Sequence, residues 1–409
     1  MQALSVNVLI LGGGAAGLWL LDEVRRRGLS ALLLEATDLG QGQTVCPQGI
    51  LHSGLKYMLD GLPTAAAKAA REMPLRWKDC LRGRQQPDLT GTELRSSAFH
   101  LWGTESASSR LGLLGAQLGL RVTPHRISAK DYPLPLRGCR GIVLRVDEQI
   151  ISPSSLIQSL AARNAHHLLK IDPVHGLKFH QLEHGTVESV GIQNPENPAH
   201  ELSIRPDQVV LAAGSGNGAL RERLGFDSAQ MQLRPLHMVQ IRGNLPEFYG
   251  HCVEGSHTRV SITSAQDSTG RRIWQVGGQI AEDGVSMSAD EVIHRCQAEI
   301  SHVMPHLSLL GTEWSSYWAN RAEGATLLGK RPDSYRILQE KNILTAWPTK
   351  LVLVPQLVDA ICVKLGSLRP KPLEQSQALD GFARPAVALP PWETLTDWIP
   401  WRQSSRAAA

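Results

Sequence analysis

The chain has 409 residues, which at about 150 residues per domain is enough for two or three domains. Hydrophobic residues make up 42% and charged residues 20% of the sequence, so a sizeable core can form and a disordered or low-complexity class is excluded. The net charge of +4 is spread along the chain, and it is too weak for a nucleic-acid-binding surface.

The six cysteines stand far apart and none forms a CxxC pair. This spacing excludes a disulfide scaffold, and we expect no zinc cluster or other metal site. Scattered single thiols are typical of a reducing compartment, so we expect a cytoplasmic location. No basic segment precedes the first apolar run, which argues against a signal peptide, and no apolar stretch reaches the ~18 residues of a membrane span.

The N-terminal sequence predicts a strand, a glycine-rich turn, a helix and a second strand. A continuous apolar run predicts a strand buried on both faces over residues 6–11. Helical spacing of the apolar residues predicts a helix over 15–27, which Gly28 ends. A second apolar run predicts a strand over 31–34, and Glu35 follows it directly.

The turn carries glycines in GxGxxG spacing, each with its own physical task. Gly12 permits the tight turn, Gly14 lets a pyrophosphate approach the backbone, and Gly17 lets the helix pack against the strand. The helix N-terminus, which includes Ala16, offers N–H groups to the phosphates. Glu35 can accept a hydrogen bond from a ribose 2′-hydroxyl, and its charge disfavours the 2′-phosphate of NADP. The motif therefore predicts a dinucleotide and leaves FAD and NAD open.

The segment after Glu35 separates these two cofactors. It is a polar, glycine-rich loop followed by the block ILHSGLKY at residues 50–57, where an NAD domain would continue with an ordinary helix and strand. This arrangement resembles the FAD-dependent D-amino-acid-oxidase-like superfamily. Members include glycine and sarcosine oxidases, L-2-hydroxyglutarate oxidase and flavin-linked glycerol-3-phosphate dehydrogenase, and ILHSGLKY is most similar to the last two. The resemblance implies FAD and makes an NAD-dependent dehydrogenase the weakest alternative.

Later segments extend the resemblance over most of the chain. Residues 146–165 are similar to a segment that enters a helix beside the sheet, with Ser152 as its cap and Pro153 in its first turn. Residues 171–179 resemble a strand whose backbone near Val174 contacts the adenine. Residues 206–220 resemble a buried strand that ends in a small-residue turn beside the pyrophosphate.

Two further segments resemble the parts of the family that surround the flavin. Residues 233–243 are similar to a strand that crosses between the two domains, and 345–365 to the strand, turn and closing helix beneath the flavin. Many relatives have a glycine-rich turn where this chain has Trp-Pro-Thr-Lys, which matches the dehydrogenase-like pattern. The implied FAD-binding residues are Gly12, Gly14, Ala16, Gly17, Glu35, Ala36, Gln43, Thr44, Leu51, His52, Val174, Ala213, Gly214, Thr349, Lys350 and Leu351.

The resemblance implies an α/β fold: a Rossmann-type, glutathione-reductase-like FAD-binding domain and a second, α+β substrate domain built on an antiparallel sheet. Runs over 233–241 and 270–276 are candidate strands, and Ser288 and Glu291 form a capping box before a helix. The expected division is 1–82, 150–218 and 322–375 for the FAD domain, 83–149 and 219–321 for the substrate domain, and 376–409 for an extended C-terminal tail.

Three residues are candidates for catalysis. Lys350 precedes a helix and is placed to stabilise negative charge on the reduced flavin at N1 and O2. Arg321 matches the family's arginine for a substrate carboxylate or phosphate, because its planar fork binds such anions bidentately. His52 can take a proton from an alcohol as the hydride leaves. Each also has a plain structural alternative, as a surface lysine, a domain-interface ion pair and a cofactor hydrogen bond.

The candidate substrate-binding residues surround these positions. Besides Arg321 they are Lys56, Tyr57, His257 and Trp274, with Arg331 as a weaker second anion anchor. Lys56 stands where the dehydrogenases have a phosphate-contacting arginine, which weakens the case for a phosphorylated substrate.

Cys46 lies where some amine-oxidising relatives attach FAD covalently. A cysteine can form a flavin thioether, but we expect a small residue near the ring and FAD that is not covalently bound. The tryptophans of the tail, Trp392, Trp398 and Trp401, are expected to dock on the protein, with a peripheral membrane contact as the alternative.

The resulting hypothesis is an FAD-dependent oxidoreductase that oxidises a CH–OH or CH–NH bond of a small, anionic, hydroxy- or amino-acid-like substrate by hydride transfer to flavin N5. Oxygen or a quinone would accept the electrons. The alternative is an FAD-binding protein of structural or tRNA-modification type without small-molecule turnover. The weak basic charge counts against RNA.

Overall fold

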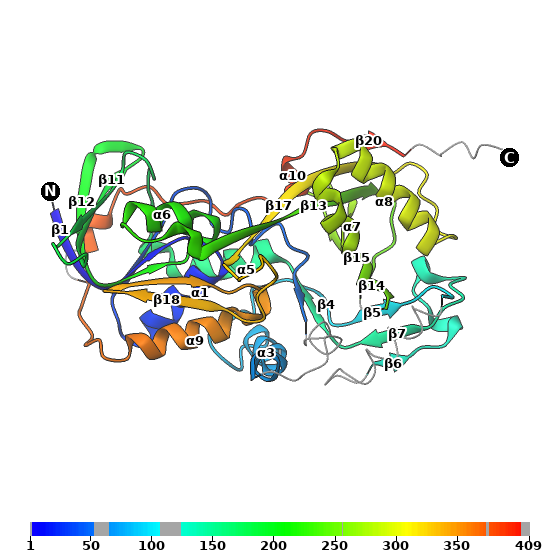
Figure 1. Cartoon of the computed structure of the whole chain (residues 1–409), viewed down its shortest axis with the longest axis horizontal. Helices are drawn as coiled ribbons and strands as arrows, with labels where there is room; N and C mark the ends of the chain where they lie inside the picture. The colour runs from blue at the N-terminus through cyan, green and yellow to red at the C-terminus, as the bar shows by residue number, and fades with distance from the viewer. Residues whose placement is uncertain (1, 53–64, 107–123, 256, 374–375, 402–409) are drawn as a thin grey trace.

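The computed structural model describes residues 2–52, 65–106, 124–255, 257–373 and 376–401. Figure 1 shows an elongated molecule with two lobes, which we call the first lobe (around β1, α1 and α9) and the second lobe (around β14, β5 and α8). Each lobe has its own large sheet. The first sheet has eight strands and the second has nine.

The first lobe is built on parallel strands at its centre. The path runs β10-β11-β12-β1-β2-β9, and β19 pairs with both β12 and β18. β1 is parallel to β2, β12 is parallel to β19, and β18 adds an antiparallel edge. The strands are β1 (Gln2–Leu11), β2 (Ala31–Glu35), β9 (Leu168–Lys170), β10 (Leu177–Gln181), β11 (Val187–Asn194), β12 (Asn197–Leu211), β18 (Arg336–Glu340) and β19 (Ile343–Trp347).

The central strand β1 is buried on both faces, as its largely apolar sequence predicts. Val8 and Ile10 pack into the core under the helices, whereas Leu9 and Leu11 pack into a second core on the opposite face. The helices that cover the first face are α1 (Ala15–Arg26), α3 (Ala65–Leu81), α5 (Pro153–Asn164) and α9 (Val354–Leu365). The predicted cap of α5 is confirmed, because Ser152 Oγ accepts a hydrogen bond from the N–H of Ser155 at 3.4 Å.

The second lobe has a mostly antiparallel sheet with the order β20-β17-β13-β16-β15-β14-β5-β7-β6. The predicted capping box is present, with Ser288 and Glu291 at the start of α8 (Ala289–Val303), and α8 packs its apolar side on one face of this sheet. The strands are β5 (Phe99–Trp102), β6 (His125–Arg126), β7 (Val143–Val146), β13 (Met231–Gly243), β14 (Tyr249–Glu254), β15 (His257–Gln266), β16 (Arg272–Gly277), β17 (Glu313–Gly324) and β20 (Ile399–Pro400).

Two long strands connect the lobes. β13 and β17 pair antiparallel from Met231 opposite Gly324 to Arg242 opposite Glu313, without a register shift. Figure 1 shows both arrows, green and yellow, crossing the centre of the molecule. The predicted crossing strand is therefore confirmed. A small third sheet, formed by β3 (Ile50–Leu51), β8 (Gln149–Ile151) and β4 (Leu94–Ser96), lies apart from both large sheets.

Two predictions require correction. Residues 172–176 form a turn rather than a strand, because the Asp172 carboxylate accepts the backbone N–H groups of Val174 and His175 at 2.8 and 3.1 Å. Residues 83–92 also pack with the first lobe instead of the second. Leu89 is fully buried in the core beneath α5, and Thr92 Oγ1 lies 3.3 Å from Ser159 Oγ.

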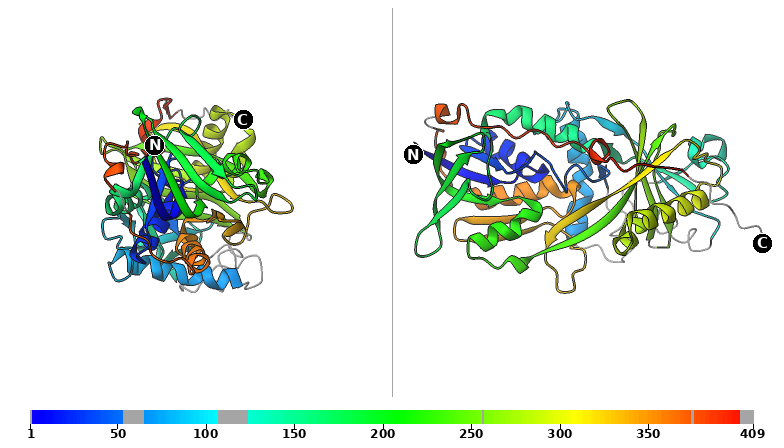
Figure 2. Two further views of the ribbon diagram at one scale, coloured as in Figure 1. Left: turned by 90° about the vertical axis from the view of Figure 1, so that its left-hand side faces the viewer. Right: turned by 90° about the horizontal axis from the view of Figure 1, so that it is seen from above.

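Residues 376–401 of the C-terminal tail extend along both lobes, as Figure 2 shows for the red segment seen from above. Leu39 holds it to the first lobe, donating its N–H to Ala386 O at 2.7 Å and accepting from Ala388 N at 3.0 Å. In the second lobe Trp392 is only 6% exposed and Arg95 lies over its ring. The expected docking of the tail is thus confirmed. Within the described ranges, no helix combines the length and apolar character needed to cross a bilayer.

Substituting Trp392 by alanine should lower the free energy of unfolding by about 3 kcal/mol, because a buried aromatic side chain is removed. The midpoint of thermal unfolding measures this loss. Leu389→Ala is the control, since this neighbouring side chain is 61% exposed. An unchanged midpoint for Trp392→Ala, or vesicle binding by the intact chain that this substitution abolishes, would contradict the docked arrangement.

Candidate active site

The turn between β1 and α1 leaves no room for side chains. Gly12 has φ +113°, and a Cβ there would lie 2.5 Å from Ala213 Cα, while a Cβ on Gly17 would lie 1.9 Å from Gly12 O. α1 begins without a side-chain cap at Gly14 and without an acidic residue in its first turn, which includes Ala16. Bare backbone and an uncompensated positive helix end therefore fit a pyrophosphate group.

Glu35 ends β2 directly beside this turn. Its Oε2 accepts the N–H of Gly13 at 2.6 Å, and its Oε1 accepts the N–H and the hydroxyl of Thr37 at 2.8 and 3.0 Å. A carboxylate has about four acceptor positions, so capacity for a ribose hydroxyl remains. The backbone of Ile171 donates to Glu35 O at 2.9 Å, which places the exposed turn with Val174 next to the same strand end.

The loop that continues from Ala36 joins the glycine turn to the crossing strands. Thr44 Oγ1 lies 3.3 Å from the N–H of Ala15 at the start of α1. Gln43 Oε1 accepts the N–H of Ala322 in β17 at 2.9 Å. The turn after β12, with Ala213 and Gly214, also lies here, because a Cβ on Gly214 would lie 4.0 Å from Gln43 Oε1. These predicted FAD-binding residues are thus brought together.

The segment after β19 has an unusual backbone. Thr349 has φ +63°, a left-handed conformation that a β-branched residue adopts only at a cost of about 1–3 kcal/mol. Its hydroxyl donates to Ser334 O at 2.8 Å, which helps to hold the turn. Glycine would adopt this conformation without that cost. Lys350 and Leu351 follow at the start of the helical segment, which lies against β3, the strand that contains Leu51.

His52 follows β3 and has a partner that the sequence did not indicate. Its Nδ1 lies 3.1 Å from Glu148 Oε2, and the Glu148 side chain is only 5% exposed. Glu148 lies in the connection between β7 and β8, inside the segment 146–165, which the sequence marked for its helix and not for an acid. Only the pairing of β3 with β8 brings the two residues together.

Arg321 lies in β17 among other charged groups. Its contacts to Glu282 Oε1 and to the backbone oxygen of Arg234 are long, 3.5 and 3.4 Å. Burial lowers the pKa of Arg321, and the guanidinium groups of Arg234 and Arg331 lower it further. By contrast, Arg234 is paired bidentately with the buried Glu323 at 2.7 and 2.9 Å. Because its own contacts are long, the Arg321 guanidinium is suited to bind an anionic group.

Not all predicted substrate residues join this group. Trp274 is fully buried on the α8 side of the sheet and donates its indole N–H to Pro246 O at 2.8 Å, so its role is packing and the prediction is corrected. His257 lies exposed at the end of the β14–β15 hairpin, opposite Glu254. Lys56 and Tyr57 lie outside the described residues.

The strand residue after Trp274 faces the candidate site instead. Gln275 Nε2 donates to Tyr317 Oη at 3.0 Å and to Cys46 O at 3.2 Å, and Tyr317 Oη donates to Cys46 O at 2.8 Å. Side chains alternate along a strand, so Tyr317 shares its face with Arg321. Because every second residue of a strand lies on the same face, counting back from Arg321 in the sequence would have found Tyr317. Gln275 could be found only by knowing which residues of β16 lie on that face.

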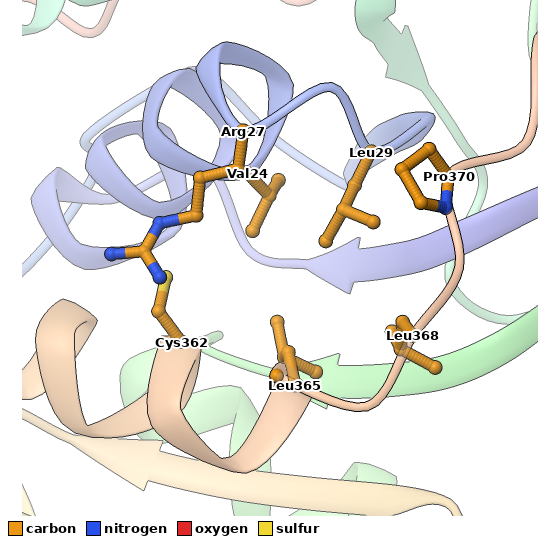
Figure 3. A pocket seen from close by; sticks show the side chains of 8 residues that line it. Val24, Arg27, Leu29, Cys362, Leu365, Leu368 and Pro370 are labelled. Atoms are coloured by element: carbon orange, nitrogen blue, oxygen red, sulfur yellow. The ribbon is translucent and has the colours of Figure 1, made fainter.

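A separate pocket lies at the other ends of the helices. Figure 3 shows Arg27 pointing toward Cys362, with Val24, Leu29 and Leu365 around them. These residues lie at the C-terminal ends of α1 and α9, whereas the glycine turn and Lys350 lie at the N-terminal ends. The pocket is therefore not part of the candidate site.

Glu35→Ala should weaken FAD binding roughly ten- to a hundredfold, since a charge-assisted hydrogen bond contributes about 1.5–3 kcal/mol. Equilibrium dialysis of the yellow cofactor measures the change. Asp38→Asn is the matched control, because this nearby acid pairs with Lys170 and not with the glycine turn. Equal retention of FAD by Glu35→Ala and by the wild type would refute the ribose contact.

The FAD should be released from acid-precipitated protein into the supernatant. Burial raises the pKa of Cys46 to about 11, so roughly one thiol in 10,000 is a nucleophilic thiolate at pH 7. Absorbance of the supernatant and the pellet measures the distribution. Colour that stays in the pellet of the wild type but is released from Cys46→Ser would show a thioether instead.

The comparisons with known proteins agree with this site. Residues 7–346 match the family model described as FAD dependent oxidoreductase. A probable FAD-dependent oxidoreductase of Pseudomonas aeruginosa is 36% identical over 397 residues, covering 96% of this chain and 98% of that protein. The crystal structure of an FAD-dependent oxidoreductase from the same organism has a TM-score of 0.81 at 33% identity, covering 96% of this chain and 99% of that one.

More distant structures share the fold. An FAD-bound L-α-glycerophosphate oxidase of Mycoplasma pneumoniae has a TM-score of 0.62 at 15% identity, covering 90% of this chain and 96% of that one. Glycine oxidase of Geobacillus kaustophilus has a TM-score of 0.60 at 14% identity, with the same two shares covered. The family model matches most of the sequence, and the glycine turn with Glu35 fits a dinucleotide. The chain therefore belongs to the D-amino-acid-oxidase-like family of FAD-dependent oxidoreductases.

Proposed function

We propose that this oxidoreductase removes a hydride from a CH–OH or CH–NH carbon of a small, anionic, hydroxy- or amino-acid-like substrate. Bound FAD supplies the electron chemistry by accepting that hydride at N5. The observation that carries the proposal is Arg321, a largely buried guanidinium with two long contacts on the sheet face that also presents Tyr317. Such a group binds a carboxylate or phosphate in two parallel hydrogen bonds.

The surroundings of Arg321 support an anionic substrate. Arg234 and Arg331 lie near enough to lower its pKa, and Glu323 is already occupied by Arg234. Glu282 is the carboxylate within ion-pair distance of Arg321, and its side chain is 37% exposed. The neighbouring guanidinium groups therefore favour the binding of an anion at Arg321.

Lys350 and the helix behind it have a second role in the proposal. Lys350 precedes the helical segment that runs into α9, and the first turn of α9 has neither a side-chain cap nor an acidic residue. A lysine and a positive helix end stabilise negative charge that develops nearby. With FAD bound, they would stabilise the negative charge that the reduced flavin carries at N1 and O2.

The two types of substrate differ in their demand for a base. An alcohol must lose its hydroxyl proton as the hydride leaves, whereas a neutral amine has no hydroxyl proton to lose. His52, next to its buried carboxylate, is the proposed base and favours the alcohol type. The structural relatives named above include both an amine-acting and a glycerophosphate-acting oxidase. A panel of 2-hydroxy acids, amino acids and glycerol 3-phosphate, tested for anaerobic bleaching of the flavin, distinguishes the two.

Arg321→Ala should slow flavin reduction by the best member of that panel roughly a hundredfold, for a loss of about 2.7 kcal/mol of transition-state stabilisation. The FAD spectrum should stay intact, because Arg321 is not assigned to the cofactor. Arg321→Lys should restore only part of the rate, since lysine lacks the bidentate fork. Anaerobic stopped-flow absorbance measures each rate.

Arg242→Ala is the control for this experiment. Arg242 lies on the paired strand β13 but at the far end of the sheet, where it pairs with Glu313 at 2.8 Å. Equal rates for Arg321→Ala and the wild type at full FAD occupancy would make Arg321 a structural residue. The anion anchor would then be sought among Lys56, Arg331 and His257.

A further inference from the structure

A buried carboxylate stands directly opposite His52. β3 and β8 pair antiparallel with Ile50 opposite Ile150 and Leu51 opposite Gln149. The next position in this register places His52 opposite Glu148. Directly opposite residues of an antiparallel pair have Cβ atoms about 5 Å apart, which suits a hydrogen bond between an imidazole and a carboxylate. The backbone itself therefore builds this pair.

The contact determines which ring nitrogen of His52 carries the proton. Nδ1 lies 3.1 Å from Glu148 Oε2. When Glu148 is ionised, its carboxylate only accepts hydrogen bonds, so Nδ1 donates and in the neutral ring Nε2 holds the lone pair. The exposed fractions, 39% for His52 and 5% for Glu148, show that the ring reaches solvent while its partner does not.

Two aromatic side chains restrict the orientation of the His52 ring. His251 from β14 stacks on it with 5.3 Å between centroids and 28° between planes. Phe99 from β5 lies edge-on to both rings, with centroids 6.3 Å from His52 and 4.4 Å from His251. A ring held on one face and at its Nδ1 edge keeps Nε2 in a constant direction.

We propose that Glu148 is a positioning residue that fixes His52 in the Nδ1–H tautomer and leaves Nε2 ready to take the substrate's proton. This inference rests on the proposed function. As the carbon of an alcohol substrate gives its hydride, with both electrons, to FAD, the hydroxyl proton passes to Nε2 and a C=O double bond forms. Glu148 then faces the imidazolium and stabilises its charge.

The tautomer is measured directly, without substrate, in ¹⁵N-histidine-labelled holoenzyme by NMR of the ring nitrogens. The chain has 15 histidines, so the His52 signal is assigned by its loss in His52→Gln. The wild type should show Nδ1–H, and Glu148→Gln should populate Nε2–H. The control is Glu299→Gln, whose carboxylate pairs with Arg259 at 2.6 Å, away from His52. An unchanged tautomer in Glu148→Gln would overturn the proposal.

Kinetic coupling tests whether Glu148 acts through His52. With the panel member that reduces the flavin fastest, Glu148→Gln should slow reduction roughly 10- to 100-fold, as loss of a residue behind a reacting group does. The double variant should be no slower than His52→Gln alone, because the second change removes nothing further. Glu148→Asp should recover part of the rate. Multiplying effects in the double variant would overturn the proposal.

The outcomes separate this inference from the proposed function. If His52→Gln reduces the flavin as fast as the wild type, His52 is not the base and the proposed mechanism fails. If His52→Gln reduces the flavin slowly and the double variant is slower still, His52 remains the base, but Glu148 does not act through it. If Glu148→Gln does not fold, the tautomer and rate of Glu148→Ala decide, and wild-type values for both would overturn the proposal.

Discussion

The antiparallel pair β13–β17 is the constraint on which the candidate site depends. It runs from the first lobe into the second without a register shift, so residues far apart along each strand keep a fixed phase. On β17 this phase places Arg321 and Tyr317 on one face. Ala322 of the same strand binds Gln43, and Tyr317 binds Cys46, so the cofactor loop of one lobe is attached to the sheet of the other. A bulge in this pair would separate Arg321, the proposed substrate anchor, from that loop.

The site is assembled from the ends of elements. The glycine turn and the start of α1, the end of β2 with Glu35, the turn after β12 and the start of the last helical segment all meet at one edge of the first sheet. Parallel strands direct their carboxyl ends to the same side, and the helices that follow them begin there. A dinucleotide bound at this edge contacts backbone that carries no side chains and the positive ends of helices. The opposite ends of α1 and α9 line the separate pocket (Figure 3).

Charge is distributed unevenly between the two sides of the site. Burial raises the pKa of Cys46 in the cofactor loop and that of Tyr317 beside it, which keeps both groups neutral. The guanidinium groups of Arg234 and Arg331 lie around Arg321, and the buried Glu148 carboxyl group lies behind His52. This arrangement suits the proposed anionic substrate and the proposed proton-accepting histidine.

The sequence by itself determined the nucleotide half of this protein. An apolar strand, GxGxxG spacing and an acid at the next strand end are local patterns, and each element formed where its pattern predicted. Local patterns also gave the cap of α5 and the capping box of α8, and the family resemblance gave the crossing strand. The resemblance failed at residues 172–176, where the Asp172 side chain binds the backbone in a turn, and Trp274, expected in the substrate pocket, faces the core.

Only the tertiary structure determined which residues lie together on the proposed substrate side of the site. Glu148 lies in a segment that the sequence marked only for its helix, and it reaches His52 through the register of two very short strands, which no single segment encodes. Tyr317 and Gln275 meet at Cys46 because loops and strands more than 200 residues apart come together. Cofactor binding relies on backbone geometry that short segments specify, whereas substrate chemistry relies on side chains placed by strand phase and pairing across the whole chain.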